Sequence, residues 1–122
     1  MSRMSAIITT KNNAETIEEC IRRVINAPPK DKEIVVVYGR SRDGTERIIK
    51  KFNGKVKPIL DDVSTGSAIN TGVLDSEGEI IFYVEGHSYV TAEIFVKALE
   101  TFEEDSDVGY ILFRRYIPSD FK

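Results

Sequence analysis

Short runs of apolar residues alternate along this chain with segments in which apolar residues recur every three or four positions. The runs are rich in β-branched and aromatic residues and have the length of strands, whereas the periodic segments are typical of helices with one buried face. Strands are expected at residues 6–10, 33–38, 55–60, 80–84 and 108–113. The alternation of strand and helix with short connections predicts an α/β fold. We expect a Rossmann-like three-layer α/β/α arrangement around a mostly parallel sheet of about five strands.

Polar residues before the periodic segments predict where the helices begin. Asn12 with Glu15, and Asp43 with Glu46, have the spacing of a capping box, in which the two residues satisfy each other's backbone amides. The expected helices run over about 13–26, 44–52, 67–75 and 92–102. Asp43 therefore has an explanation as a helix start, besides any role in binding.

The expected strand order is third, second, first, fourth, with the fifth strand near the fourth. Five consecutive apolar residues at 80–84 predict a central strand buried on both faces. Pro58 cannot donate to a strand ladder and predicts that the third strand lies at an edge. In this order the first and fourth strands flank the switch point of the sheet, which places Thr10, Tyr38 and Glu85 near one crevice.

Composition limits the classes of protein that the chain can represent. Its 122 residues suit one domain, and a net charge of −3 with a pI near 5.2 argues against a nucleic-acid partner. Cys20 is the single cysteine, so no internal disulfide is expected. No apolar run has the length of a transmembrane segment, and the first five residues are too short for a signal peptide, so a cytoplasmic location is expected.

Candidate chemistry lies directly after the fourth strand, in the sequence Glu85-Gly86-His87. Glu85 and the only histidine of the chain are two positions apart, so in extended backbone they point the same way and can share a divalent cation. The alternative is a polar strand end with a glycine turn, because such a pair is common by chance. Gly66, before the third helix, would leave backbone amides free to face an anion.

Several stretches in the right order resemble one family, the inverting family-two glycosyltransferases of the GT-A type, in their amino-terminal nucleotide-binding half. The stretches are the first strand with its Thr-Lys-Asn turn, the second strand with Ser-Arg-Asp-Gly-Thr, the Gly-Ser-Ala-Ile-Asn-Thr-Gly helix, and the strand that ends in Glu85. Together they cover nearly the whole chain. The resemblance implies a single GT-A-like domain over residues 1–122 that lacks the acceptor half.

The resemblance also implies a ligand and a cofactor. A nucleotide-diphosphate sugar would lie across the crevice, with Mn²⁺ or Mg²⁺ held by Glu85 and His87 against the diphosphate as a Lewis acid. The candidate residues for binding the nucleotide sugar are Thr10, Lys11, Tyr38, Asp43, Gly66 and Glu85. The acceptor of the sugar stays unknown.

The chain departs from the family pattern at three points. Tyr38-Gly39 stands where the family usually has an acidic pair, and Ile69 stands where it commonly has an arginine. Glu85-Gly86-His87 replaces Asp-x-Asp, although some GT-A enzymes use an Asp-x-His pair near manganese. No residue can be assigned as the general base that inverting transfer requires.

Three interpretations therefore stay open. The first is a glycosyltransferase, or its donor half, that binds a metal–nucleotide–sugar complex. The second is a non-catalytic, degenerate GT-A domain that serves as a binding or oligomerisation module, with a homodimer as one form. The third is an unrelated doubly wound domain of the receiver type, for which the sequence offers no convincing phosphoacceptor set.

Overall fold

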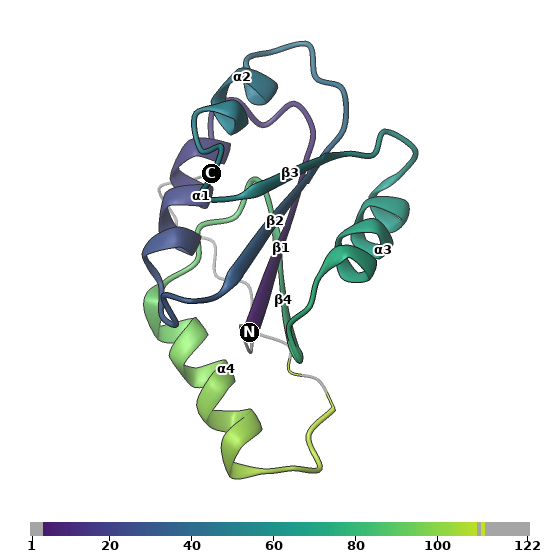
Figure 1. The fold of residues 1–122 in the computed structure, drawn as a ribbon. Coiled ribbons are helices and arrows are strands. Elements are labelled where there is room, and N and C mark those ends of the chain that lie inside the picture. Colours follow the sequence, from purple (N-terminus) through teal and green to yellow (C-terminus); the bar gives the residue numbers. More distant parts are fainter. Residues whose placement is uncertain (1–3, 110, 112–122) are drawn as a thin grey trace, which may run out of the picture.

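The structure, a computed structural model, describes residues 4–109 and 111. Four parallel strands form one sheet in the order β3-β2-β1-β4 (Figure 1). The strands are β1 (Met4–Thr10), β2 (Glu33–Tyr38), β3 (Lys57–Leu60) and β4 (Ile80–Glu85). The helices are α1 (Ile17–Asn26), α2 (Thr45–Lys50), α3 (Thr65–Asp75) and α4 (Ala92–Glu104).

Helices cover both faces of the sheet, which confirms the three-layer α/β/α fold. Figure 1 shows α1, α2 and α4 on one side of the strands and α3 on the other. The main core lies on the side of α1 and α4, where the rings of Phe82 and Phe95 stack with centroids 4.0 Å apart. A smaller core lies under α3 and consists of Ile7, Val35, Val37 and Ala68, with Ile59 beside it. β1 is buried along its whole length because it has a strand on each side and a helical layer on each face.

Close packing of α3 on the sheet depends on Gly72. A Cβ atom at this position would lie 2.4 Å from Cγ2 of Ile7 and 3.3 Å from Cγ2 of Val37. Real Cβ atoms do not approach other heavy atoms so closely, so only glycine lets α3 approach β1 and β2 at this distance. The position of α3 matters because its first turn forms one wall of the pocket described below.

The predicted order of the first four strands is correct, but the prediction that strand 80–84 is buried on both faces is wrong. Burial in β4 alternates, and Ile81 and Tyr83 are each 37% exposed. The reason is that α3 packs mainly against β1 and β2, and β4 ends the sheet among the described residues. The predicted fifth strand at 108–113 includes residue 110 and residues 112–113, which lie outside the described part of the chain.

The predicted capping boxes are also wrong in detail. α1 begins at Ile17 after Thr16, because Asn12 adopts a left-handed φ of 53° and the chain makes one further turn first. α2 begins after Gly44, and Glu46 accepts a hydrogen bond from the amide of Ser41, 3.1 Å away, and not from residue 43. Both acidic side chains of this second box therefore order the loop before α2 and do not form a reciprocal cap.

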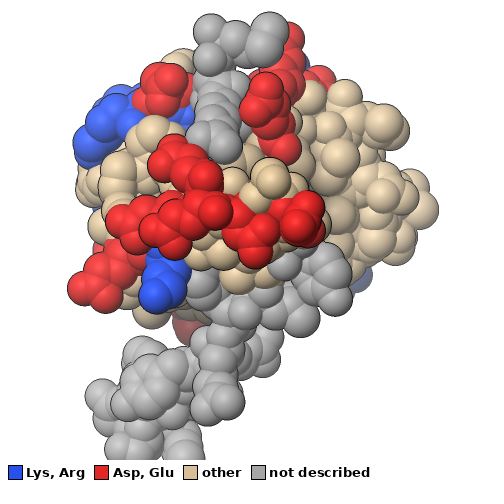
Figure 2. All heavy atoms as spheres, turned by 90° about the horizontal axis from the view of Figure 1, so that it is seen from below, with Lys and Arg blue, Asp and Glu red and all other residues tan. Residues whose placement is uncertain are grey.

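Acidic side chains gather on the face at one end of the molecule. Figure 2 shows the face at the amino ends of the strands, where acidic side chains predominate over basic ones. The carboxyl ends of the parallel strands lie at the opposite end of the molecule. Within the described part of the chain, no helix combines the length and the apolar character needed to cross a membrane.

Candidate functional site

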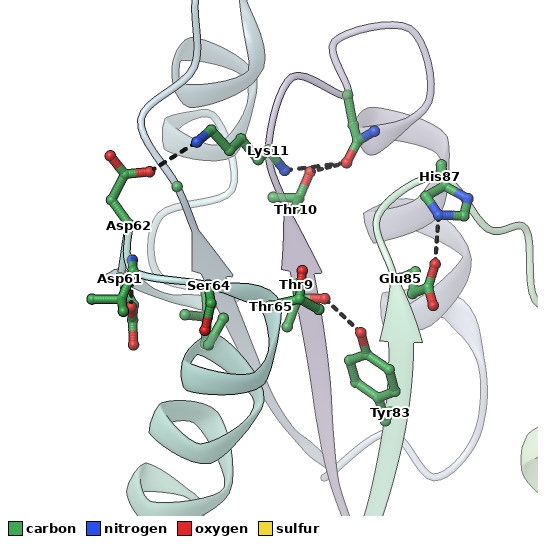
Figure 3. Close-up of a pocket in the computed structure, with 15 residues that line it drawn as sticks. Thr9, Thr10, Lys11, Asp61, Asp62, Ser64, Thr65, Tyr83, Glu85 and His87 are labelled. Atoms are coloured by element: carbon green, nitrogen blue, oxygen red, sulfur yellow. Dashed lines mark hydrogen bonds and ion pairs between the residues drawn. The ribbon is translucent and has the colours of Figure 1, made fainter.

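A pocket of about 460 Å³ lies at the carboxyl edge of the sheet (Figure 3). Its walls come from the ends of β1, β2 and β4, from the loop after β3 and from the first turn of α3. The lining residues are Thr9, Thr10, Lys11, Asn13, Val37, Gly39, Asp61, Asp62, Val63, Ser64, Thr65, Ala68, Tyr83, Glu85 and His87. This is the edge at which open parallel α/β sheets bind ligands, because the loops that follow the strands meet there.

Glu85 and His87 contact each other at one side of the pocket. Oε2 of Glu85 lies 2.5 Å from Nε2 of His87, and the two side chains are 41% and 51% exposed. The intervening Gly86 lies so close to β1 that a Cβ there would be 2.6 Å from Oγ1 of Thr10. Its amide donates to the carbonyl of Thr9 over 2.7 Å, which fixes the turn. The glycine therefore brings the carboxylate and the imidazole together on the pocket side of the chain.

The donor atoms of this pair fit a divalent cation. A carboxylate oxygen with an imidazole nitrogen is a set that Mn²⁺ accepts. Adjacent ligands at about 2.1 Å from an ion lie about 3 Å apart, so a small rotation of either side chain makes room. Among the described residues, no group of three or more His, Cys, Asp or Glu side chains surrounds one point. The remaining ligands would have to be water or oxygen atoms of a bound molecule, which is how Mg²⁺ is commonly held beside phosphates.

The opposite side of the pocket carries Lys11 and Asp62 (Figure 3). Nζ of Lys11 lies 3.4 Å from Oδ1 of Asp62, which also accepts a hydrogen bond of 3.1 Å from the amide of Arg40. Both side chains lie over Gly39, where a Cβ would be 2.8 Å from Oδ1 of Asp62 and 3.1 Å from Cδ of Lys11. The absence of a side chain at Gly39 thus leaves space for the carboxylate of Asp62, which comes from the loop after β3.

Asp61 has a different role from its neighbour Asp62. Its Oδ2 accepts hydrogen bonds from the hydroxyls of Ser67 (2.9 Å) and Thr71 (2.6 Å), and Oδ1 accepts from the amide of Val63 (3.1 Å). The bond from Thr71, then those from Val63 and Ser67, hold the pKa of Asp61 below its usual value, because they favour the ionised carboxylate. Asp61 ties the loop after β3 to α3 and so fixes this wall of the pocket.

Hydroxyl groups form the floor between the two sides. Oγ1 of Thr9 and the phenolic oxygen of Tyr83 lie 2.8 Å apart and share one hydrogen bond (Figure 3). Oγ1 of Thr10 donates to Oδ1 of Asn13 over 2.7 Å, and that same oxygen accepts from the amide of Lys11. The floor is polar and is ordered by bonds between β1, β4 and the turn after β1.

The structure brings together four of the residues that the sequence indicates. Thr10, Lys11, Glu85 and His87 line the pocket. Tyr38, Asp43 and Gly66 are not among its lining residues.

The structure places each of these three residues outside the pocket lining. Tyr38 packs against the main core, because residues 34, 36 and 38 of β2 face α1 while residues 35 and 37 face α3. The carboxylate of Asp43 accepts from Thr45 and from the amide of Ala14, and these bonds lower its pKa, with the Thr45 hydroxyl as the largest cause. Gly66 is exposed in the first turn of α3.

Sequence reasoning missed Asp61, Asp62, Thr9 and Tyr83 as pocket residues. Asp61 and Asp62 directly follow the predicted third strand, so their place at the carboxyl edge could have been recognised from the strand pattern. Tyr83 lies within the apolar run 80–84, for which the sequence predicts burial on both faces, so the sequence gives no indication that its side chain faces the pocket. Its exposure to the pocket follows from the end position of β4 in the described sheet.

Fold and pocket together define a class: a Rossmann-like α/β domain with a polar ligand site at the carboxyl edge of a parallel sheet. Residues 5–122 match the family described as Glycosyl transferase family 2, and the chain belongs to this family. Its fold is that of the GT-A glycosyltransferases.

Relatives and solved structures agree on this assignment. The glycosyltransferase AglE of Haloferax volcanii is 36% identical over 90 residues, which are 68% of this chain and 30% of that protein. The cholesterol galactosyltransferase of Borreliella burgdorferi is 29% identical over 92 residues, 72% of this chain and 26% of that protein. Staphylococcus aureus TarS 1–349, solved in complex with UDP-GlcNAc, superposes with a TM-score of 0.69 at 26% identity over 85% of this chain and 32% of that chain.

A further structure shows the same fold at lower identity. The mannosyltransferase PcManGT of Pyrobaculum calidifontis, in complex with GDP-Man and Mn²⁺, superposes with a TM-score of 0.71 at 23% identity over 82% of this chain and 32% of that chain. The chain spans about a third or less of the length of the relatives and structures named here. The activities named for these relatives are therefore properties of those longer proteins and are not assigned to this chain by the comparison.

Proposed function

We propose that the pocket binds a nucleotide-diphosphate sugar together with Mn²⁺ or Mg²⁺, and that the protein serves transfer of the sugar to an acceptor. The observation that carries this proposal is the contact between Glu85 and His87 at the carboxyl end of β4. It places an oxygen and a nitrogen donor beside a pocket large enough for a small ligand. A cytoplasmic location, as expected from the sequence, is part of the proposal.

The residues of the pocket have separate parts in this proposal. Glu85 and His87 hold the cation, which when bound supplies Lewis-acid stabilisation of charge on the departing diphosphate. Lys11 contributes a second positive charge at the mouth of the pocket, and the hydroxyls of Thr9 and Thr10 offer hydrogen bonds to the ligand. No described residue is assigned as the general base, so the proposal for this chain centres on binding of the sugar donor.

Two comparisons support the ligand class. TarS was solved with UDP-GlcNAc, and PcManGT with GDP-Man and Mn²⁺. These two structures superpose on 85% and 82% of this chain, respectively.

A thermal-shift experiment tests the proposal. UDP or GDP at about a hundred times its dissociation constant, with Mn²⁺, should stabilise the protein by about 2.7 kcal/mol and raise the melting temperature by roughly 10 °C. The same nucleotide with EDTA should give a much smaller shift. Mn²⁺ alone is the control for metal effects on the protein. Absence of a shift with every common nucleoside diphosphate would contradict the proposal.

The second candidate function is a non-catalytic GT-A module that acts through protein contacts, as a homodimer for example. The substitutions of Tyr38-Gly39 and Ile69 at family positions, together with only two donor side chains at the metal position among the described residues, favour this candidate. It predicts no effect of nucleotides and a melting temperature that rises with protein concentration. Sedimentation at several concentrations separates the two functions.

A further inference from the structure

The turn between α2 and β3 contains the one asparagine of the chain that a glycine follows, at Asn53-Gly54. Phe52 and Val56 on either side are 9% and 6% exposed and belong to the main core. Asn53, Gly54 and Lys55 between them are exposed. The two ends of this turn are therefore held in the core, while its tip lies in solvent.

An asparagine side chain can react with the backbone of the residue that follows it. The backbone nitrogen of that residue attacks the side-chain carbonyl carbon and closes a five-membered ring, which is favourable because both groups belong to the same short stretch of chain. A hydrogen bond from the same N–H opposes the attack, because the nitrogen must lose its proton to become a nucleophile. A side chain on the following residue crowds the approach, so glycine hinders it least.

Two asparagines in the loop after β1 are protected from this reaction. Asn12 is followed by the amide of Asn13, which donates to Oγ1 of Thr45 over 2.8 Å. Asn13 is followed by the amide of Ala14, which donates to Oδ2 of Asp43 over 3.0 Å. In both cases a side chain near the start of α2 engages the nitrogen that would have to attack.

Two asparagines in helices are protected by backbone hydrogen bonds. Asn26 is the last residue of α1, and the amide of Ala27 donates to the carbonyl of Arg23 over 3.1 Å. Asn70 lies inside α3, where each amide binds a carbonyl of the preceding turn. Reaction at either position requires that part of a helix opens first.

Gly54 differs from the residues that follow the other four asparagines. Its amide donates no hydrogen bond to any residue that the structure describes, and none of these residues holds the side chain of Asn53 by a hydrogen bond. A Cβ at Gly54 would meet no heavy atom within 4 Å, and the φ of this glycine is 93°. The carboxamide can therefore reach the free nitrogen without displacing a neighbour.

We propose that the protein modifies itself at Asn53 without an enzyme. The Gly54 nitrogen loses its proton to a base in solution and bonds to Cγ of Asn53, the bond from Cγ to the side-chain nitrogen breaks, and ammonia leaves a succinimide ring behind. Water then opens the ring. Opening at Cγ gives aspartate, and opening at the backbone carbonyl carbon gives isoaspartate, in which the main chain runs through the former side chain. In sum water replaces ammonia, and nothing is oxidised or reduced.

Isoaspartate would weaken the turn that leads into β3. The carbonyl of Phe52 accepts hydrogen bonds from the amides of Lys55 (2.9 Å) and Val56 (3.1 Å), and these bonds close the turn. Isoaspartate adds one methylene to the main chain inside the closed turn. Because Phe52 and Val56 are held in the core, the added length should break one or both bonds, whereas conversion to aspartate only adds a charge.

Mass spectrometry of peptides from protein incubated in mildly alkaline buffer tests the proposal. The peptide with Asn53 should gain the mass difference between OH and NH₂ and separate into aspartate and isoaspartate forms. Its conversion should be at least about tenfold faster than at any other asparagine, since those amides must first lose a hydrogen bond. The rate should rise with pH, because a base removes the proton of the attacking nitrogen. Conversion at Asn53 no faster than at Asn70 would overturn the proposal.

The same measurement in guanidinium chloride separates the effect of the structure from that of the sequence. In the unfolded chain every amide is free, so the other four asparagines should convert faster than they do in the folded protein. Asn53 should convert within about threefold of its rate in the folded protein, since its amide is free in both states. A folded rate at Asn53 far below the unfolded rate would show that the turn protects it and would contradict the proposal.

Three variants complete the test. Asn53→Gln should abolish the conversion, because the longer side chain must close a larger ring, while Asn70→Gln in α3 is the matched control and should leave conversion at Asn53 unchanged. Asn53→Asp has the charge of the products on an ordinary backbone. Freshly prepared, it should unfold at a higher urea concentration than the isoaspartate fraction of the incubated protein. Equal midpoints would refute the effect on the turn.

Discussion

At the scale of single residues, two glycines decide where the charged side chains of the pocket lie. Gly86 lets the chain pass against Thr10, and Gly39 leaves space that Asp62 and Lys11 occupy. A side chain at either position would displace a group that the proposed function uses. These positions show why residues without chemistry of their own can be as important to a site as its charged groups.

His87→Ala removes the nitrogen donor of the proposed metal pair. We expect the affinity for a nucleoside diphosphate in the presence of Mn²⁺ to fall at least about tenfold. Loss of a residue that only hydrogen-bonds a metal ligand already lowers metal affinity by about that factor, and His87 would be a ligand itself. Glu85→Gln should act in the same direction. Glu93→Gln, an exposed position in the first turn of α4, is the matched control. Titration with and without Mn²⁺ gives the answer, and an unchanged metal dependence in His87→Ala would exclude the assigned role.

Asp61 should make the protein sensitive to acid. Its pKa in the folded state is lowered by the bonds from Thr71, Val63 and Ser67, so its contribution is present above the unfolded value of about 3.9 and is lost as the pH falls through the folded pKa. Asp61→Asn should be less stable near pH 7 and should lose less stability on acidification. Urea unfolding between pH 2.5 and about 7 measures both effects. An identical acid dependence in the two proteins would refute the assignment.

At the scale of elements, the site depends on how strand ends and helix starts meet. β1 contributes Thr10, β4 contributes Glu85, and the loop between β3 and α3 contributes Asp62. These groups are distant in sequence and become neighbours only because the strands are parallel and pair in the order β3-β2-β1-β4. Changes that move α3 or β4 should therefore affect the pocket as well as stability.

Two alanine substitutions in α3 should have opposite effects. Gly72→Ala places a Cβ 2.4 Å from Ile7, so the free energy of unfolding should fall by about 1–3 kcal/mol as α3 moves away from the sheet. Gly66→Ala meets only Oγ of Ser64, at 4.0 Å, and should raise the free energy of unfolding by up to about 1 kcal/mol because alanine favours helix. Urea unfolding of both variants measures the difference. Equal effects would mean that the packing of α3 is not as close as the structure shows.

At the scale of the whole molecule, the sequence predicts the architecture better than the site. The alternating pattern yields the three-layer fold and the strand order, because those depend on burial and on connection length. It does not reveal that Tyr38 faces the core or that Tyr83 faces the pocket, since an all-apolar strand carries no signal for its two faces. It also does not reveal that Asp62 fills the space over Gly39, which depends on the distance between two loops.

Lys32 contacts both the segment after α1 and the Phe95 ring of α4. It should make the free energy of unfolding depend on pH in the alkaline range. The residue is 8% exposed, and its ammonium group donates to the carbonyls of Ala27 and Pro29 and lies 5.6 Å from the centre of the Phe95 ring. Burial, with a contribution from the charge of Lys30, lowers its pKa from 10.5 to about 8. The unfolded chain then binds more protons between these values, so stability should rise with pH across that range. Comparison with Lys32→Met by urea unfolding at several pH values isolates the effect, and parallel profiles would contradict it.

The acidic face at the amino ends of the strands (Figure 2) has a consequence for the approach of a charged molecule. With a net charge of −3, the protein repels a free polyanion in solution, and the acidic side chains of that face contribute to the repulsion. An anionic ligand that enters the pocket at the other end of the molecule meets Lys11, which is exposed there beside Asp62. A donor that arrives already complexed with its cation is nearly neutral, so its encounter rate should depend on ionic strength far less than that of the bare nucleotide.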